Sequence, residues 1–178
     1  MRFVDFLKTT VLLSAGAATA LAAVSVLASA AGTGSGTLLV GVDVGWWAIA
    51  TVIGLRLGRR AQVSPAIARL LSAARASTSL PEYRPGAILV NRLWPLALYT
   101  LLSGGLAFLA PQIPGIAAGF AIIPALAWRR QDAAVAAVEE RDGAAFYVQR
   151  TSPVRAISLV RAPGFSASRP QRVNGAVG

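Results

Sequence analysis

The sequence predicts an all-α integral membrane protein: a four-helix transmembrane bundle with both termini in the cytoplasm and a small cytoplasmic β-hairpin or meander. Three observations predict this fold class. Of the 178 residues, 55% are hydrophobic and 13% are charged, whereas ordinary globular chains carry about 25% charged residues. The apolar residues form long uninterrupted blocks. The basic residues lie almost entirely between and beyond these blocks.

Four apolar blocks mark the predicted transmembrane segments. They cover residues 9–31, 37–55, 87–109 and 113–128. An α-helix needs about 20 apolar residues to cross a hydrocarbon core of ~30 Å, and most of these blocks are close to that length. The Gly-rich link after the first block makes the first two blocks an antiparallel hairpin. Residues 1–131 are therefore predicted to form the transmembrane domain.

The first block also allows a second interpretation. Ala28, Ser29 and Ala30 resemble a signal-peptidase site behind a weakly basic N-terminus. Cleavage there would leave three spans and an outside N-terminus. The apolar region of a signal peptide has only ~7–15 residues, and this block is longer. A membrane anchor that stays in the protein is the preferred interpretation.

The placement of the basic residues predicts the orientation. Lys and Arg occur only in residues 1–8, 56–92 and 129–178, on one side of the spans, and the two links on the other side carry no charge. Cytoplasmic loops are enriched in Lys and Arg, so both termini are predicted to be cytoplasmic. The net charge of +10 then indicates anionic inner-leaflet lipids as neighbours, not nucleic acid. Sixteen of the 17 basic residues are Arg in an Ala-rich chain, which favours the inner membrane of a bacterium.

The cytoplasmic loop, residues 56–86, contains one helix signal. Ser64 and Pro65 place a capping residue before a proline in the first turn. Apolar residues then recur at helical spacing up to about Ala76. This segment is predicted to be either an amphipathic helix on the membrane surface or an ordinary solvated connector helix.

The tail is predicted to hold a small cytoplasmic β module at residues 132–165. Two segments, 135–140 and 144–149, flank Asp142 and Gly143. An Asp-Gly pair between alternating residues is a hairpin signal, so the two segments are predicted to pair as strands.

A third alternating segment, residues 155–161, would complete a meander. The competing interpretation continues the fourth helix through the Ala-rich stretch to about Glu140. Ser, Pro, Arg and Gly dominate residues 166–178, which are predicted to form a disordered basic tail.

Asp43 is the only acidic residue inside a predicted span. Ionisable residues in a span are costly, and they indicate function by default. Asp43 is therefore a candidate proton or cation site facing the bundle interior, together with Asn91 and Arg92 in the first turns of the third block. The alternative is a carboxylate that reaches outward to water or pairs with a backbone donor. Trp46 and Trp47, near the middle of the second block, are interpreted as packing residues.

Two further sets of residues are singled out by spacing and charge. Glycines four residues apart let helix backbones approach closely. The predicted helix-packing glycines are Gly41, Gly45, Gly115 and Gly119. The arginines expected to contact lipid headgroups are Arg59, Arg60, Arg69, Arg75, Arg129 and Arg130.

The residue inventory argues against an enzyme. The chain has no Cys and no His, and zinc sites, haem sites and Ser-His pairs normally need one or the other. No Gly-rich loop precedes Lys-Ser or Lys-Thr as a phosphate-binding loop requires. We therefore expect no catalytic residue, no bound metal and no cofactor.

The preferred functional hypothesis is a non-enzymatic accessory or scaffolding membrane protein. Its basic loop and tail would contact anionic lipid headgroups or a protein partner. One alternative is a small homodimeric proton- or cation-coupled transporter that uses Asp43. A weaker alternative is a membrane enzyme of lipid or cell-wall assembly that uses Glu139, Glu140 and Asp142.

Overall fold

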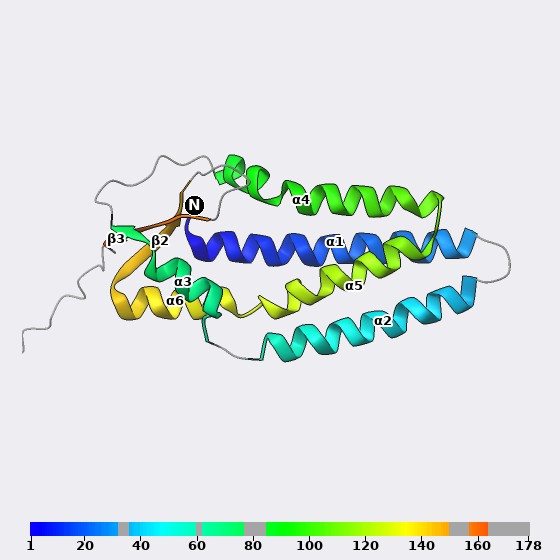
Figure 1. Cartoon of the computed structure of the whole chain (residues 1–178), viewed down its shortest axis with the longest axis horizontal. Coiled ribbons are helices and arrows are strands. Elements are labelled where there is room, and N and C mark those ends of the chain that lie inside the picture. The colour runs from blue at the N-terminus through cyan, green and yellow to red at the C-terminus, as the bar shows by residue number, and fades with distance from the viewer. Residues whose placement is uncertain (32–35, 60–61, 77–84, 150–156, 164–178) are drawn as a thin grey trace, which may run out of the picture.

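The computed structural model describes residues 1–31, 36–59, 62–76, 85–149 and 157–163, and within these ranges the protein is mostly helical. Four long helices run along the long axis of the molecule (Figure 1). They are α1 (Phe3–Ala31), α2 (Gly36–Leu57), α4 (Pro85–Gly105) and α5 (Gln112–Ala127). A 3₁₀ turn, η1 (Leu106–Phe108), follows α4.

Shorter elements gather at the end of the bundle where α1 begins (Figure 1). They are the helices α3 (Pro65–Ser72) and α6 (Gln131–Asp142) and the strands β1 (Arg75–Ala76), β2 (Ala144–Val148) and β3 (Leu159–Pro163). These elements and the first turns of α1 are called the cap. The opposite end of the bundle, at Ala31, Gly36 and residues 106–112, is called the far end.

Two of the described helices are long and apolar enough to cross a membrane. They are α1, with 29 residues, and α2, with 22 residues, and only 22% and 17% of their most apolar windows are buried in the protein. The helix α4 carries Asn91, Arg92 and Pro95, and α5 has only 16 residues. Length and composition therefore support two of the four predicted spans.

The bundle is built around α5. This helix packs between α1 and α2, and α4 packs mainly against α1. The buried face of α5 consists of small residues and one proline: Pro114, Gly115, Ala117, Ala118, Gly119, Ala121 and Ala125. Small residues let helix backbones approach closely. Large apolar side chains such as Leu12, Val42 and Leu101 point away from the bundle and are exposed.

The cap has the only large-residue core in the described part of the chain. Its buried members come from α1, α3, α4, α6 and both longer strands: Phe3, Val4, Phe6, Leu7, Ile67, Ile88, Val135, Phe146, Val148 and Leu159. The helix α1 therefore runs from the bundle into the cap without a break, and its first two turns belong to the cap core.

The predicted strand at 135–140 is wrong, because this segment is part of the helix α6. Gly143 ends α6 with φ of 58°, and its N–H bonds to the Glu139 carbonyl. Gly at a helix C-terminus and Gly in a tight hairpin both adopt positive φ, so the Asp-Gly signal was real but was assigned to the wrong structure. The competing interpretation, in which the fourth helix continues to about Glu140, is closer to the structure. The difference is that a turn at 128–130 separates α6 from α5.

The sheet has three strands, but it is not a meander. Its order is β1-β3-β2, with β2 antiparallel and β1 parallel to β3. The third strand, β1, thus comes from the loop at residues 56–86 that was predicted to be cytoplasmic. The strand predicted at 144–149 is present as β2, and Phe146 and Val148 face the core.

The strand predicted at 155–161 begins only at Leu159 within the described part of the chain. Residues 155 and 156, the predicted disordered tail at 166–178, and Arg60 lie outside the described residues.

The helix α3 is a cap element. Ser64 caps it, with the hydroxyl oxygen accepting from the Ile67 N–H at 3.4 Å. Its apolar face turns inward, where Ile67 is buried in the cap core and Leu70 and Leu71 pack against it. The connector interpretation therefore fits better than an apolar face inserted into a membrane.

Candidate functional site

Asp43 lies inside the bundle and is only 4% exposed. The Ser25 hydroxyl of α1 donates a hydrogen bond to Asp43 Oδ2, and the same hydroxyl oxygen lies 3.4 Å from the Pro111 carbonyl oxygen. Asp43 is therefore turned inward, and among the described residues its hydrogen-bond partner is a side-chain hydroxyl and not a backbone donor. It links α2 to α1 at the point where α5 begins.

Two glycines of α5 receive side chains of α2. A Cβ atom at Gly115 would overlap the Asp43 carboxylate, and a Cβ at Gly119 would overlap the Trp46 indole. Both glycines therefore form notches in α5. The expected partner glycines on α2 are not at this contact, because nothing lies within 4 Å of a Cβ at Gly41 or Gly45.

Gly41 and Gly45 miss the contact with α5 because of the angle between successive residues on a helix. Gly41 and Gly45 are each two residues from Asp43, and residues two apart point to different sides of a helix. The face of α2 that meets α5 carries Asp43 and Gly54 instead. A Cβ at Gly54 would lie 2.8 Å from Leu126 Cβ and 3.1 Å from the Ile123 carbonyl oxygen.

Aromatic donors from two helices hold α5 through its carbonyl groups. Trp47 Nε1 donates to the Gly115 carbonyl at 2.8 Å, and Trp46 Nε1 donates to the Ile116 carbonyl at 3.0 Å. Tyr99 on α4 donates to the Ala117 carbonyl at 3.0 Å. Away from water a polar donor must find a partner within the protein, and these bonds fix the position of α5 relative to α2 and α4.

Ser25 and Gly54 were missed by sequence reasoning. The sequence signal for Ser25 was the spacing of small residues on α1. The buried small residues are Ser14, Ala18, Ser25 and Ser29, and their separations of about four and about seven residues correspond to one and two turns of a helix. Ser29 Oγ has no hydrogen-bond partner among the described residues.

The three residues of the expected ion site are not brought together. The helix α2 begins at the far end, and Asp43 lies about two turns into it. The helix α4 begins at the cap end (Figure 1), and Asn91 and Arg92 lie about two turns into it. Both residues are half-buried and have interaction partners of their own.

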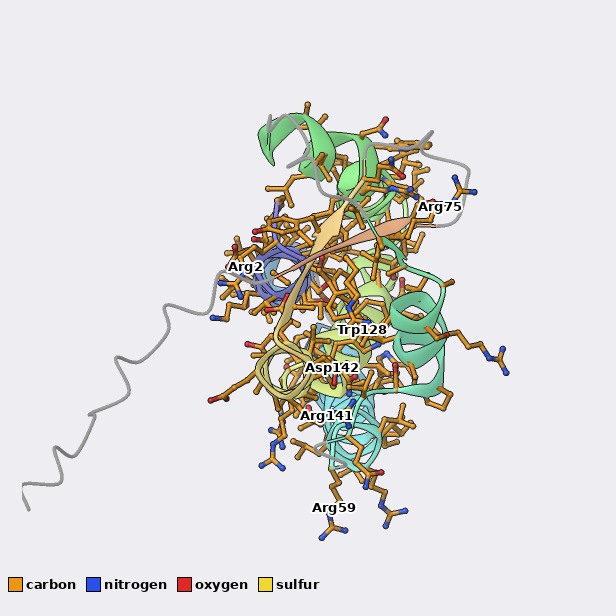
Figure 2. All side chains as sticks on the ribbon, turned by 90° about the vertical axis from the view of Figure 1, so that its left-hand side faces the viewer. Arg2, Arg59, Arg75, Trp128, Arg141 and Asp142 are labelled. Carbon is orange, nitrogen blue, oxygen red and sulfur yellow. The ribbon has the colours of Figure 1, made fainter. Side chains whose placement is uncertain are left out.

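Basic side chains surround the cap and the adjoining ends of the helices. Figure 2 looks along the long axis at this end and shows Arg59 and Arg75 pointing outward in different directions. Six exposed arginines in residues 56–76 and 129–130, none of which forms an ion pair within the described ranges, are called the arginine belt: Arg56, Arg59, Arg69, Arg75, Arg129 and Arg130. The guanidinium of Arg130 lies 3.5 Å from the Arg59 carbonyl oxygen.

The tail carboxylates do not converge on one site. The Glu139 side chain, 5% exposed, accepts from Arg2 Nη2 at 2.6 Å and from the Phe146 N–H at 2.8 Å, and its hydrogen bond raises the pKa of Arg2. Asp142 pairs with Arg141 at 2.9 Å, and that hydrogen bond lowers the pKa of Asp142. Glu140 is exposed. The described residues contain no group of three His, Cys, Asp or Glu side chains that could hold a metal ion.

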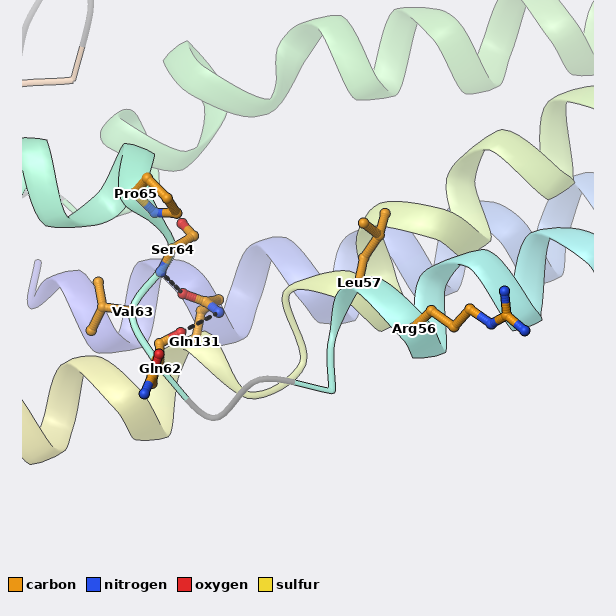
Figure 3. A pocket seen from close by; sticks show the side chains of 7 residues that line it. All are labelled: Arg56, Leu57, Gln62, Val63, Ser64, Pro65 and Gln131. Carbon is orange, nitrogen blue, oxygen red and sulfur yellow. Dashed lines mark hydrogen bonds between the residues drawn. The ribbon is translucent and has the colours of Figure 1, made fainter.

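A pocket of about 430 Å³ lies where the bundle meets the cap (Figure 3). On its cap side, Gln131 Oε1 accepts from the Ser64 N–H at 2.9 Å and Gln131 Nε2 donates to the Gln62 carbonyl at 3.2 Å. The Arg56 guanidinium lies back along α2, away from these groups. These hydrogen bonds connect the segment before α3 to the start of α6.

No family model, curated protein or solved structure matches this chain.

Proposed function

We propose that the chain is a multi-pass protein of the bacterial inner membrane with four spans and both termini in the cytoplasm. It acts as a non-enzymatic accessory or scaffolding protein. The arginine belt holds the cap against anionic headgroups and leaves the outer surface of the cap for a protein partner. One observation carries this proposal: the described parts of the three basic segments, far apart in the sequence, lie at one end of the bundle. The sequence of the links at the far end contains no charged residue.

The outer surface of the bundle supports the membrane part of the proposal. Small residues lie inside and large apolar ones outside, and Phe108 at the far end is 95% exposed. Soluble monomers rarely expose large continuous apolar patches, and lipid would cover this one. The helices α4 and α5 run alongside α1 and α2 (Figure 1) and expose Leu101 and Phe120, so the same apolar layer would enclose all four.

Single cysteines test the four-span topology, because the native chain has no Cys. Gln112→Cys, at the exposed start of α5, is expected to react in intact cells with a thiol reagent that cannot cross membranes. Gln62→Cys, in the exposed segment before α3, is expected to react only after permeabilisation. Labelling of Gln62→Cys in intact cells would show that the true topology is the reverse of the proposed one. Protection of Gln112→Cys under both conditions would contradict the outer turn between the third and fourth spans.

The belt has the right charge and placement for an anionic surface. A basic residue close to such a surface contributes about 1 kcal/mol, and the effect falls off within a Debye length of ~10 Å at 0.1 M salt. Arg129 and Arg130 lie between α5 and α6, at the level of the proposed interface. Arg141 lies at the other end of α6, about 18 Å farther along the helix axis.

The belt is tested by comparing nanodiscs of phosphatidylglycerol with nanodiscs of phosphatidylcholine. The native protein is expected to show a higher melting temperature in phosphatidylglycerol, and Arg129→Gln with Arg130→Gln should remove most of that difference. Arg141→Gln with Arg161→Gln removes the same formal charge from the exposed cap surface and should leave most of the difference intact. An equal loss in both double variants would show that only net charge matters and would overturn the role of the belt.

A further inference from the structure

A polar cluster lies inside the bundle near the far end, where α1 ends and α2 begins (Figure 1). Its side chains are Asp43 on α2 and Ser25 and Ser29 on α1, which are 4%, 0% and 3% exposed. The carbonyl group of Pro111, just before α5, belongs to the same cluster, because its oxygen lies 3.4 Å from Ser25 Oγ. Carboxylate, hydroxyl and carbonyl oxygens are the ligands that hard cations prefer.

The charge of Asp43 has no counterion in the described part of the chain. The Ser25 hydroxyl donates to Asp43 Oδ2, and Oδ1 accepts no hydrogen bond from a described residue. No Lys or Arg occurs in residues 9–55 or 93–128, which make up most of the bundle. The first turn of α5, which meets the carboxylate at Gly115, contributes only about half a positive charge. A buried carboxylate without a full counterion is strongly unfavourable, so the cluster lacks a positive charge.

Ser29 gives a second, independent indication of a ligand. Its buried hydroxyl group has no hydrogen-bond partner among the described residues, whereas most buried polar groups have one. Ser29 follows Ser25 by four residues, so both side chains lie on one face of α1 with Cβ atoms about 5–6 Å apart. Oxygens bind Ca²⁺, an ion close in size to Na⁺, at about 2.3–2.6 Å. One ion of this size between the two serines can therefore contact both hydroxyl oxygens.

We propose that this cluster binds one monovalent cation of the size of Na⁺. Its ligands are Asp43 Oδ1, the two serine hydroxyl oxygens and the Pro111 carbonyl oxygen. A single positive charge balances the one carboxylate, whereas a divalent ion would leave a net positive charge inside the bundle. The ion joins α1, α2 and the start of α5, so it stabilises their packing. The site requires neither the arginine belt nor a particular orientation in the membrane.

The test is the melting temperature of the protein in detergent micelles as a function of Na⁺, with choline chloride keeping the ionic strength constant. A ligand that binds only the folded state stabilises it. The native protein is therefore expected to melt at a higher temperature in NaCl, with an effect that saturates. Asp43→Asn keeps the size of the side chain but removes its charge, and it should abolish the Na⁺ effect.

Ser29→Ala separates a ligand from a packing residue. The hydroxyl has no described partner to lose, so a merely structural role predicts unchanged or slightly higher stability without Na⁺. Loss of a ligand should instead raise the Na⁺ concentration that gives half of the effect by about tenfold or more. Ser14→Ala is the matched control and should leave the Na⁺ effect unchanged. Ser14 is also a buried serine of α1, but it lies about 16 Å before Ser25 along the helix axis.

Three results would overturn the proposal. The first is a native melting temperature that does not respond to Na⁺, and the second is an equal Na⁺ response in Asp43→Asn or in Ser29→Ala. The third is a protonated carboxylic acid at Asp43 in NaCl, which infrared spectroscopy detects as a C=O stretching band that Asp43→Asn removes. That band would show that a proton, not a cation, neutralises the carboxylate.

Discussion

Replacing Gly115 by alanine is expected to destabilise the bundle by about 3 kcal/mol. In an unobstructed helix the same change stabilises by up to ~1 kcal/mol, because Gly is a poor helix former. At Gly115 the added methyl group overlaps the Asp43 carboxylate, and overpacking of a tight contact typically costs ~1–3 kcal/mol. The cost should lie at the upper end, because moving the carboxylate also breaks its hydrogen bond from the buried Ser25. The free energy of unfolding in mixed micelles measures the effect.

Two variants make this result specific to the contact between Asp43 and Gly115. Gly41→Ala on the exposed face of α2 has nothing within 4 Å and should be neutral or slightly stabilising. Asp43→Ala in the Gly115→Ala background removes the overlap and should recover part of the lost stability, which a double-mutant cycle detects as coupling between the two sites. If Gly115→Ala is as stable as Gly41→Ala, the carboxylate does not occupy the notch.

This contact also shows how far the sequence could predict the bundle. The four apolar blocks located the four long helices to within a few residues at most ends, and Asp43 was recognised as unusual from its type and position alone. The hydrophobicity pattern could not show which side of each helix faces inward. Both α1 and α2 are apolar around most of their circumference, and a helix that is hydrophobic all round gives no periodic signal for its buried face.

The cap was predictable in part, for a different reason. Alternation identified β2 and its inward residues Phe146 and Val148, because one face of that strand is buried. The pairing of Arg75 and Ala76 with β3 joins segments more than 80 residues apart, and two residues are too few to carry a pattern. The first turns of α1 were taken as a basic flank of the membrane span, because nothing local distinguishes a flank from a helix that continues into a second core.

Replacing Phe6 by alanine is therefore expected to unfold the cap while leaving the bundle in place. Phe6 is 3% exposed in the cap core, and its ring stacks near that of Phe3 with centroids 6.4 Å apart. Truncating a buried Phe to Ala typically costs about 3–5 kcal/mol, which is a large share of the ~5–15 kcal/mol that stabilises a typical protein. Hydrogen–deuterium exchange in nanodiscs should show lost protection in β2, β3 and α6, with α2 and α5 unchanged.

Leu12→Ala is the control on the same helix, because Leu12 is 71% exposed and such a change usually alters stability by less than about 0.5 kcal/mol. The comparison also decides between the two interpretations of the first apolar block. Cleavage after Ala30 would remove Phe3, Phe6 and Leu7 from the cap core and Ser25 from its bond to Asp43, so a folded cap requires α1 to stay attached. If the cap exchanges as slowly in Phe6→Ala as in Leu12→Ala, the first turns of α1 are not part of its core, and a cleaved signal peptide becomes the better interpretation of that block.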